Sequence, residues 1–213
     1  IWEGGGDQWP PELKRDELAR QYTAWMRERW NHPCVVIWDA QNESVTTETG
    51  AALMQVRGLD LSHRPWDNGW SQVMTETDVC ESHPYHFGDP HMTLSRAVAD
   101  KVGMPSAYGN NPDNRHAYVI NEYGWLWLNR DGTPTTLTKN LYANLAGKDA
   151  PPAKLLPLAA RLLAAETDFW RCRRQAAGVL HFTGLGYSRP WKPITSAFPA
   201  PRAARNGAMP FAS

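Results

Sequence analysis

Three things are scarce in this sequence: cysteine, net charge and long apolar runs. Cysteine occurs only three times in 213 residues, too rarely for a disulfide-built scaffold. Lys plus Arg and Asp plus Glu both number 22, so the net charge is zero. A neutral chain argues against a general polyanion binder, because phosphate binding needs a basic surface. No apolar run approaches the ~20 residues of a membrane span, so we expect neither a nucleic-acid nor a membrane partner.

The three cysteines are Cys34, Cys80 and Cys172. Their number is odd and their spacing is wide, and the first two lie in apolar, strand-like runs. We expect small buried core residues here, in preference to disulfide partners or metal ligands.

The two ends of the chain also lack expected features. There is no signal peptide, and the first residue is Ile1 instead of Met, so we expect the natural start to be missing and leave the compartment open. At the other end, residues 191–213 are rich in Ala, Pro and Arg and contain no acidic residue. The absence of periodicity there predicts an irregular tail, which leaves residues 1–190 as a single domain.

Tryptophan, in contrast, is abundant, with eleven copies. Flat aromatic faces are suited to sugar rings, although core packing is the simpler explanation. Helical spacing predicts a core position for Trp25, Trp30 and Trp170. We expect some of the others to line a cleft: Trp38, Trp66, Trp70, Trp125 and Trp127.

Helical and strand-like patterns alternate along the chain. Apolar residues at steps of three and four predict helices at residues 12–29, 47–57, 94–102, 137–145 and 153–176. Short apolar runs predict strands at residues 35–38, 64–67, 77–82, 117–120 and 178–184, and residues 2–6 resemble the mouth of another. The alternating order predicts an α/β fold with a parallel sheet.

Two of these strands end in the same dipeptide. Residues 35–38 lead to Asn42-Glu43, and residues 117–120 lead to Asn121-Glu122. Two carboxylates on either side of a glycosidic bond are the minimum machinery for its hydrolysis, and an amide beside each can bind a sugar hydroxyl without adding charge. The simpler alternative is that Glu43, Glu122 or both are ordinary surface or salt-bridged carboxylates.

Residues 31–38 (Asn-His-Pro-Cys-Val-Val-Ile-Trp) followed by Asn42-Glu43 resemble the acid/base segment of glycoside hydrolase family two, the β-galactosidase and β-glucuronidase type. Residues 61–66, 78–85 and 121–124 look like the fifth, sixth and seventh strand segments of that family. The resemblance implies a catalytic TIM (β/α)8 barrel of the retaining glycosidase clan, of which strands four to eight are present. It also implies that earlier strands and N-terminal domains of the same polypeptide are missing.

The same resemblance implies roles for individual residues. Glu43 would be the general acid/base and Glu122 the nucleophile, with Asn42 on the sugar's 2-hydroxyl and His83 or Tyr85 on the nucleophile. The other candidate substrate-binding residues are Trp66, Trp125 and Arg64; Trp125 could equally pack, and Arg64 could equally pair with a carboxylate. Gln41 stands where the family usually has Gly, and His181 and Phe182 stand where it often has Trp. No counterpart of a metal cluster is evident, and no cofactor is implied.

Three interpretations of function remain open. The first is a retaining β-glycosidase acting on a carbohydrate substrate through a covalent glycosyl-enzyme, which requires the two carboxyl groups about 5 Å apart instead of about 6.5–9.5 Å. The second is a non-catalytic carbohydrate-binding or truncated remnant of such a domain. The third is a transglycosylase. The sequence does not select the sugar.

Overall fold

The structure is a computed structural model, and it describes residues 2–6, 10–85, 115–172 and 176–184. The helix predicted at residues 94–102 and the tail predicted at residues 191–213 lie outside these ranges. The helices are α1 (Arg15–Arg29), α2 (Thr47–Val56), the short 3-10 helix η1 (Arg57–Leu59), α4 (Lys139–Ala146) and α5 (Pro152–Arg171). The strands are β1 (Trp2–Gly6), β2 (Trp38–Asp39), β3 (Gln41–Ser44), β4 (Trp66–Asp67), β5 (Cys80–Ser82), β6 (Tyr118–Ile120) and β7 (Ala176–Val179).

All four strand pairings in the described ranges are parallel, as the alternation predicts. They are β1 with β3, β2 with β4, β5 with β6 and β6 with β7. A parallel bridge between Asp67 and Val79 links β4 to the start of β5. These pairings form three small sheets, β1–β3, β2–β4 and β5–β6–β7, and the bridge connects the second sheet to the third. Because only Ala40 separates β2 from β3, neighbouring segments still follow one another in chain order. No pairing between β1 and β7 occurs among the described strands, so the partial barrel stays a prediction.

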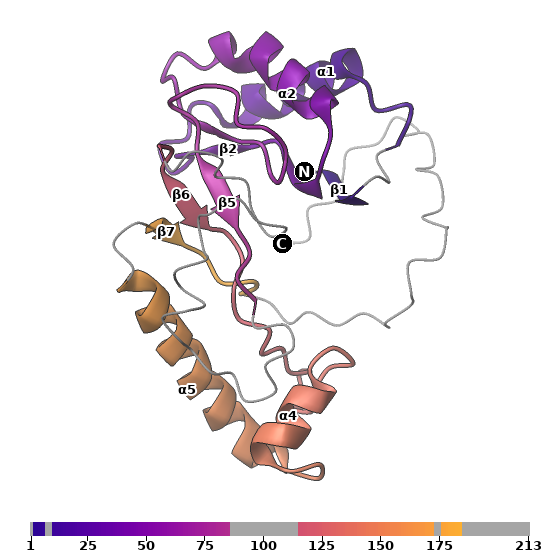
Figure 1. The fold of residues 1–213 in the computed structure, drawn as a ribbon, viewed down its shortest axis with the longest axis vertical. Helices are drawn as coiled ribbons and strands as arrows, with labels where there is room; N and C mark the ends of the chain where they lie inside the picture. Colours follow the sequence, from indigo (N-terminus) through magenta and orange to yellow (C-terminus); the bar gives the residue numbers. More distant parts are fainter. Residues whose placement is uncertain (1, 7–9, 86–114, 173–175, 185–213) are drawn as a thin grey trace.

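The helices pack at two places on this sheet. Figure 1 shows α1 and α2 together at one end of the molecule and α4 and α5 at the other, with β7 beside one end of α5. Sequence signals define the first two helices well. Leu18, Tyr22 and Met26, four residues apart on α1, are all buried. Thr46 caps α2, because its side-chain oxygen accepts a hydrogen bond from the backbone N–H of Glu48 at 3.2 Å.

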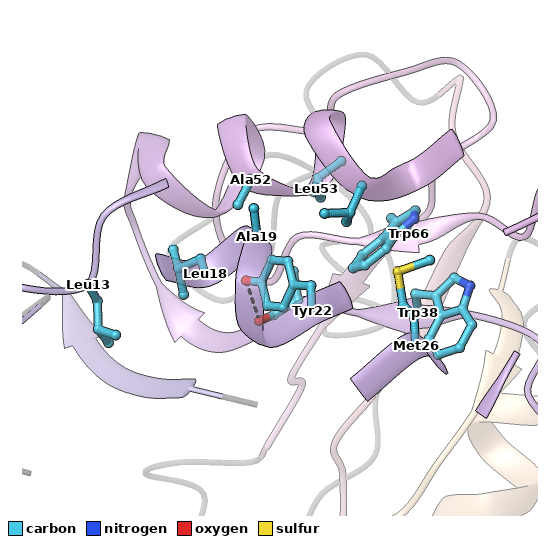
Figure 2. Packing of buried hydrophobic residues seen from close by; sticks show 11 residues of the cluster. Leu13, Leu18, Ala19, Tyr22, Met26, Trp38, Ala52, Leu53 and Trp66 are labelled. Carbon is cyan, nitrogen blue, oxygen red and sulfur yellow. Dashed lines mark hydrogen bonds between the residues drawn. The ribbon is translucent and has the colours of Figure 1, made fainter. Parts of the chain in front are cut away.

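The larger core lies between α1, α2 and the strands β2 and β4. Figure 2 shows its side chains, with Trp38 and Trp66 from the strands close to Met26 and Tyr22 from α1. The Trp38 and Trp66 ring centroids are 6.1 Å apart. The Tyr22 hydroxyl donates a 2.9 Å hydrogen bond to the Ala40 carbonyl, which anchors α1 to the junction between β2 and β3.

A second core joins α5 to β5 and β6. Trp170, fully buried, packs with Cys80, Tyr118 and Ile120. The prediction that Trp170 is a core residue is confirmed, and Trp25 and Trp30 pack, partly buried, against the larger core.

Side chains alternate between the two faces of the sheet, as they must along a strand. On β2 and β4, Trp38 and Trp66 pack in the core with the helices, whereas their neighbours Asp39 and Asp67 line a cavity of about 370 Å³. Trp38 itself and, from α1, Trp25 and Arg29 also border this cavity. We call the first side the helix face. The second, the cavity face, comprises Asp39, Asp67, Glu81, Val119, Asn121 and Leu180, of which all except Glu81 line that cavity.

Two sequence predictions fail here. The strand predicted at residues 35–38 begins only at Trp38, and Val36 has 67% of its surface exposed. Val35, Val36 and Ile37 line the open cavity, so their apolar character reflects that surface and not burial on both sides of a sheet. Cys80 is buried as predicted, but Cys34 and Cys172 are exposed free thiols, and the prediction that they are buried is wrong.

Candidate active site

The carboxyl ends of three parallel strands bring the candidate site together. Glu43 lies within β3, His83 directly follows β5, and Glu122 follows β6 after one residue. β5 and β6 are parallel neighbours that end at the same edge, so His83 and Glu122 meet there. β3, which pairs with β1, adds Glu43, 79 positions before Glu122 in the chain. Glu43 has a positive φ of 51°, a conformation that costs free energy in a non-glycine residue and is frequent at functional sites.

His83 lies between the two predicted catalytic carboxylates. Its Nδ1 atom is 3.0 Å from Glu43 Oε1 and 3.7 Å from Glu122 Oε2. The Tyr85 hydroxyl donates a 2.6 Å hydrogen bond to the same Glu122 oxygen. One ligand atom from each of Glu43, His83 and Glu122 lies within 4.8 Å of the others. The structure thus brings together both predicted catalytic residues and both of the predicted sixth-strand side chains.

A buried carboxylate supports the imidazole from below. The fully buried Glu81 places Oε2 3.1 Å from His83 Nε2, an ion-pair distance without the alignment of a hydrogen bond. The same oxygen accepts a 2.6 Å hydrogen bond from Asn121 Nδ2. Glu81 Oε1 has no hydrogen-bond partner among the described residues. His83 is therefore held between the buried carboxylate of Glu81 and the carboxylates of Glu43 and Glu122. We call Glu43, His83 and Glu122 the rim residues.

Burial and charge act in opposite directions on these groups. Burial raises the pKa of Glu122 above its usual 4.5, while the nearby His83 and the Tyr85 hydrogen bond lower it, with burial the larger effect. Burial alone would lower the pKa of His83, but its hydrogen bond to Glu43 and its contact with Glu81 raise it to about 10. His83 is then a cation at neutral pH, and it balances part of the surrounding negative charge.

Two further carboxylates lie deeper on the cavity face. Burial, reinforced by the charge of Glu81, raises the pKa of Asp39 to about 7. The same two causes, in the same order, raise the pKa of Asp67 well above its usual value. Asp67 still accepts a 3.1 Å hydrogen bond from the backbone N–H of Gly69, and Asp39 Oδ1 has no partner within the described ranges. The carboxyl groups on the cavity face therefore include Asp39 and Asp67 in addition to those of the candidate site.

Aromatic rings form one wall of the site. The Tyr85 ring lies 5.3 Å from Trp125 and 6.2 Å from Trp127, and the two indoles are 4.6 Å apart. Trp70 packs 5.6 Å from the His83 ring on another side. Trp125, half-buried and with a positive φ of 60°, is the member of this group that combines exposure with strain. Trp125 thus lies close to Tyr85 and Trp127, and its role as a sugar platform stays a prediction.

Two other predicted substrate-binding residues lie elsewhere. Trp66 is 1% exposed and packs in the core between the sheet and α1. Arg64 pairs with Asp60 at 2.8 Å and donates to the Trp30 carbonyl at 2.9 Å, the structural alternative left open for it. Neither side chain contacts Glu43 or Glu122. Asn42, half-buried on β3, remains next to the acid/base candidate.

Two residues that the sequence analysis did not assign to the site are Glu81, which belongs to it, and Gln41, which does not. Glu81 could have been found from period two, because it alternates with Cys80 and points away from the helices. Gln41, the residue that departs from the resemblance in sequence, does not enter the site. Its buried amide bonds the Ser44 carbonyl and Ser71 Oγ, and so fixes the loop after β4 against β3.

Comparisons with protein-family models, with curated proteins and with solved structures each return no match to this chain. The assignment of chemistry therefore depends on the residues of the site. Within the described ranges, none of the helices combines the length and the hydrophobicity needed to cross a membrane.

Proposed function

We propose that this chain carries the catalytic carboxylates of a retaining β-glycosidase, with Glu43 as general acid/base and Glu122 as nucleophile. One observation carries the proposal: a Glu43 and a Glu122 carboxylate oxygen lie within 4.8 Å of each other at the ends of parallel strands. Carboxyl groups about 5–5.5 Å apart suit a retaining mechanism, whereas inversion needs about 6.5–9.5 Å to admit a water molecule. The short separation favours direct attack by one carboxylate.

The first step forms a covalent bond to the protein. Glu122 attacks the anomeric carbon with a carboxylate electron pair, while Glu43 donates its proton to the glycosidic oxygen as the carbon–oxygen bond breaks. In the second step water attacks the same carbon, Glu43 takes up a proton from that water, and the Glu122 carboxylate is released. The roles require Glu43 to be protonated and Glu122 ionised at the start of the cycle.

The neighbours of Glu122 suit a nucleophile. Tyr85 donates its 2.6 Å hydrogen bond to the ionised form, and the imidazolium of His83 lies 3.7 Å away. Both lower the pKa of Glu122 against the effect of burial. The half-buried Trp125 packs edge-on to the Tyr85 ring, 5.3 Å between centroids, and so lies near the carboxylate that a sugar would approach.

Local charge suggests the class of sugar. Three carboxylates (Glu43, Glu81 and Glu122) and one imidazole make up the described hydrogen-bonding and ion-pair cluster. A substrate carboxylate placed there would add a further negative charge. We therefore expect neutral glycosides to be cleaved in preference to glucuronides, and parallel assays with nitrophenyl β-galactoside, β-glucoside, β-mannoside and β-glucuronide measure this preference.

Exposed apolar residues on the cavity face suggest a packing partner for this face. Val36 and Leu180 are 67% and 56% exposed and line the cavity of about 370 Å³. Apolar side chains in the centre of a closed barrel pack in layers against those of the opposite strands. The proposal therefore includes further strands of the same polypeptide, packed on Val36 and Leu180, as partner for this face.

Trapping with a 2-fluoro sugar bearing a good leaving group tests the proposal. Mass spectrometry of peptides is expected to find the sugar on Glu122, and a label on any other residue would contradict the assignment. Glu122→Gln and Glu43→Gln are each expected to lower kcat by several orders of magnitude. Azide should restore turnover to the Glu43 variant with a β-glycosyl azide product, and Glu76→Gln, at an exposed carboxylate, serves as the control. Added sugar acceptors then separate hydrolysis from transglycosylation.

A further inference from the structure

The three side chains at the rim also have the spacing of a metal site. His83 Nδ1 lies 3.0 Å from Glu43 Oε1 and 3.7 Å from Glu122 Oε2, and the three ligand atoms lie within 4.8 Å of one another. Zinc–ligand bonds of about 2.0–2.2 Å in a tetrahedron put neighbouring ligand atoms about 3.3–3.6 Å apart. The two histidine distances fall on either side of that value, and the two carboxylate oxygens, within 4.8 Å of each other, would move closer together around an ion.

The chemistry of the donors indicates which ions fit. One imidazole nitrogen and two carboxylate oxygens form a three-residue set of the kind that binds Zn²⁺ and leaves a fourth position for water. An all-oxygen site would favour Mg²⁺ or Ca²⁺ instead. No thiol belongs to this group of described ligand atoms, because Cys80 packs in the second core and Cys34 and Cys172 are exposed elsewhere.

A second layer of contacts supports the ligand histidine. Metal-bound histidines usually pair their other ring nitrogen with a carboxylate, which fixes the ring and raises its basicity. Here the fully buried Glu81 lies 3.1 Å from His83 Nε2, and Asn121 holds Glu81 with a 2.6 Å hydrogen bond. This arrangement leaves Nδ1 directed towards the two rim carboxylates, and it is independent of the spacing of the rim atoms.

We propose that Glu43, His83 and Glu122 bind one Zn²⁺ ion, with Glu81 as the supporting carboxylate, and that the ion and a glycoside exclude each other. Zinc would displace the proton that His83 carries on Nδ1, which leaves to solvent. The ion would occupy the acid/base and the nucleophile together, so neither could reach an anomeric carbon. The metal site depends only on the rim geometry, whereas the mutual exclusion rests on the proposed glycosidase function. Zinc would thus act as a reversible inhibitor of this site.

Direct binding to the full-length chain tests the metal site without any activity. Calorimetric titration with Zn²⁺ is expected to show one site. Co²⁺ should give the visible absorption of a four-coordinate nitrogen–oxygen site, without a sulfur-to-cobalt charge-transfer band. Absence of zinc binding, or a cobalt–thiolate band, would overturn the proposal.

Variants locate the ion. His83→Gln is expected to weaken zinc binding more than about 100-fold, because loss of a ligand exceeds the 10–100-fold effect of losing a supporting contact. Glu81→Gln should weaken it by about 10–100-fold, and it tests the same site if the His83 variant does not fold. His32→Gln changes an exposed histidine and should leave affinity unchanged. Unchanged affinity in folded His83→Gln and Glu81→Gln proteins would refute the assignment.

Inhibition separates the two proposals. Zinc should inhibit glycoside cleavage competitively, with an inhibition constant equal to the calorimetric Kd, and EDTA should reverse it. Zinc binding without glycosidase activity would remove the proposed function and leave the metal site standing. Activity unaffected by saturating Zn²⁺ would remove the mutual exclusion.

Discussion

The two faces of the sheet differ in what they do for the protein. The helix face is packed with aromatic and aliphatic side chains, among them Trp38, Trp66 and Trp170, each at most 1% exposed. The cavity face carries Asp39, Asp67 and Glu81 and borders open space. Adjacent residues such as Trp38 and Asp39 belong to different faces. Period two along short strands therefore separates the residues that stabilise the fold from those that are available for chemistry.

The two faces also contribute differently to the free energy of folding. Desolvated carboxylates without cationic partners are unfavourable unless they bind a proton. On the helix face, apolar burial contributes about 25 cal/mol per Å². The helix face must therefore supply the free energy that offsets the acidic cavity face.

The largest expected effect is a difference between two leucines. Leu53→Ala, at a fully buried position in the larger core, is expected to lower the free energy of unfolding by about 2–5 kcal/mol. Leu180→Ala, at a 56% exposed position on the cavity face, should change it by less than about 0.5 kcal/mol. Chemical denaturation of both variants measures the difference. Equal losses would mean that the cavity face is packed against something in solution.

The next effect is the dependence of stability on pH. Burial, then Glu81, raises the pKa of Asp39 from 3.8 to about 7, so the folded state binds a proton that the unfolded state releases. The resulting stability is present at low pH and is lost as the pH rises from about 4 to about 7. Asp39→Asn should flatten this slope, an effect on the order of 1–3 kcal/mol at pH 7.

Denaturation curves at pH 4, 5, 6 and 7 provide the measurement. Asp149→Asn, at an exposed carboxylate, is the matched control and should leave the slope unchanged. A slope in Asp39→Asn as steep as in the parent chain would show that the cavity-face acids are already ionised and paired.

A smaller effect concerns the catalysis that we propose for Glu43 and Glu122. Tyr85→Phe removes the 2.6 Å hydrogen bond to Glu122, which favours the ionised carboxylate. Loss of that bond raises the pKa of Glu122 further, so the acidic limb of the kcat/KM profile should move to higher pH, and kcat/KM below that limb should fall about tenfold. If the acidic limb of the kcat/KM profile stays at the same pH in Tyr85→Phe, Tyr85 does not control the ionisation of Glu122.

The smallest effect is on the helix side. Thr46→Ala removes the cap of α2 and is expected to lower the free energy of unfolding by about 1 kcal/mol. Thr46→Ser keeps the hydroxyl and should retain most of that stability. Thermal unfolding of the pair distinguishes the cap from a general effect of the loop.

Sequence reasoning succeeded where local signals are strong. The positions of α1, α2 and α4 follow from apolar spacing, and so does most of α5, although the helix predicted to reach residue 176 ends at Arg171. It failed at residues 35–37, because an apolar run looks the same whether it is buried within a sheet or lines an open cavity. For the same reason, Cys34 was wrongly predicted to be buried.

The candidate site divides in a similar way. The repeated Asn-Glu pair and the carboxyl ends of parallel strands were sufficient to predict that Glu43 and Glu122 belong together. Nothing in the sequence distinguished Arg64 and Trp66, which the fold assigns to an ion pair and a core, from residues at the rim. The direction of a side chain depends on strand register, and short strands offer few residues to determine it.

By itself, the sequence determined the helices, the parallel order of the strands and the pair of carboxylates, because these depend on local spacing and residue type. Only the tertiary structure decided that His83 lies between Glu43 and Glu122 with Glu81 behind it. That arrangement joins β3, β5 and β6, and hydrogen bonds and ion pairs between distant strands form only when the register of the whole sheet is fixed.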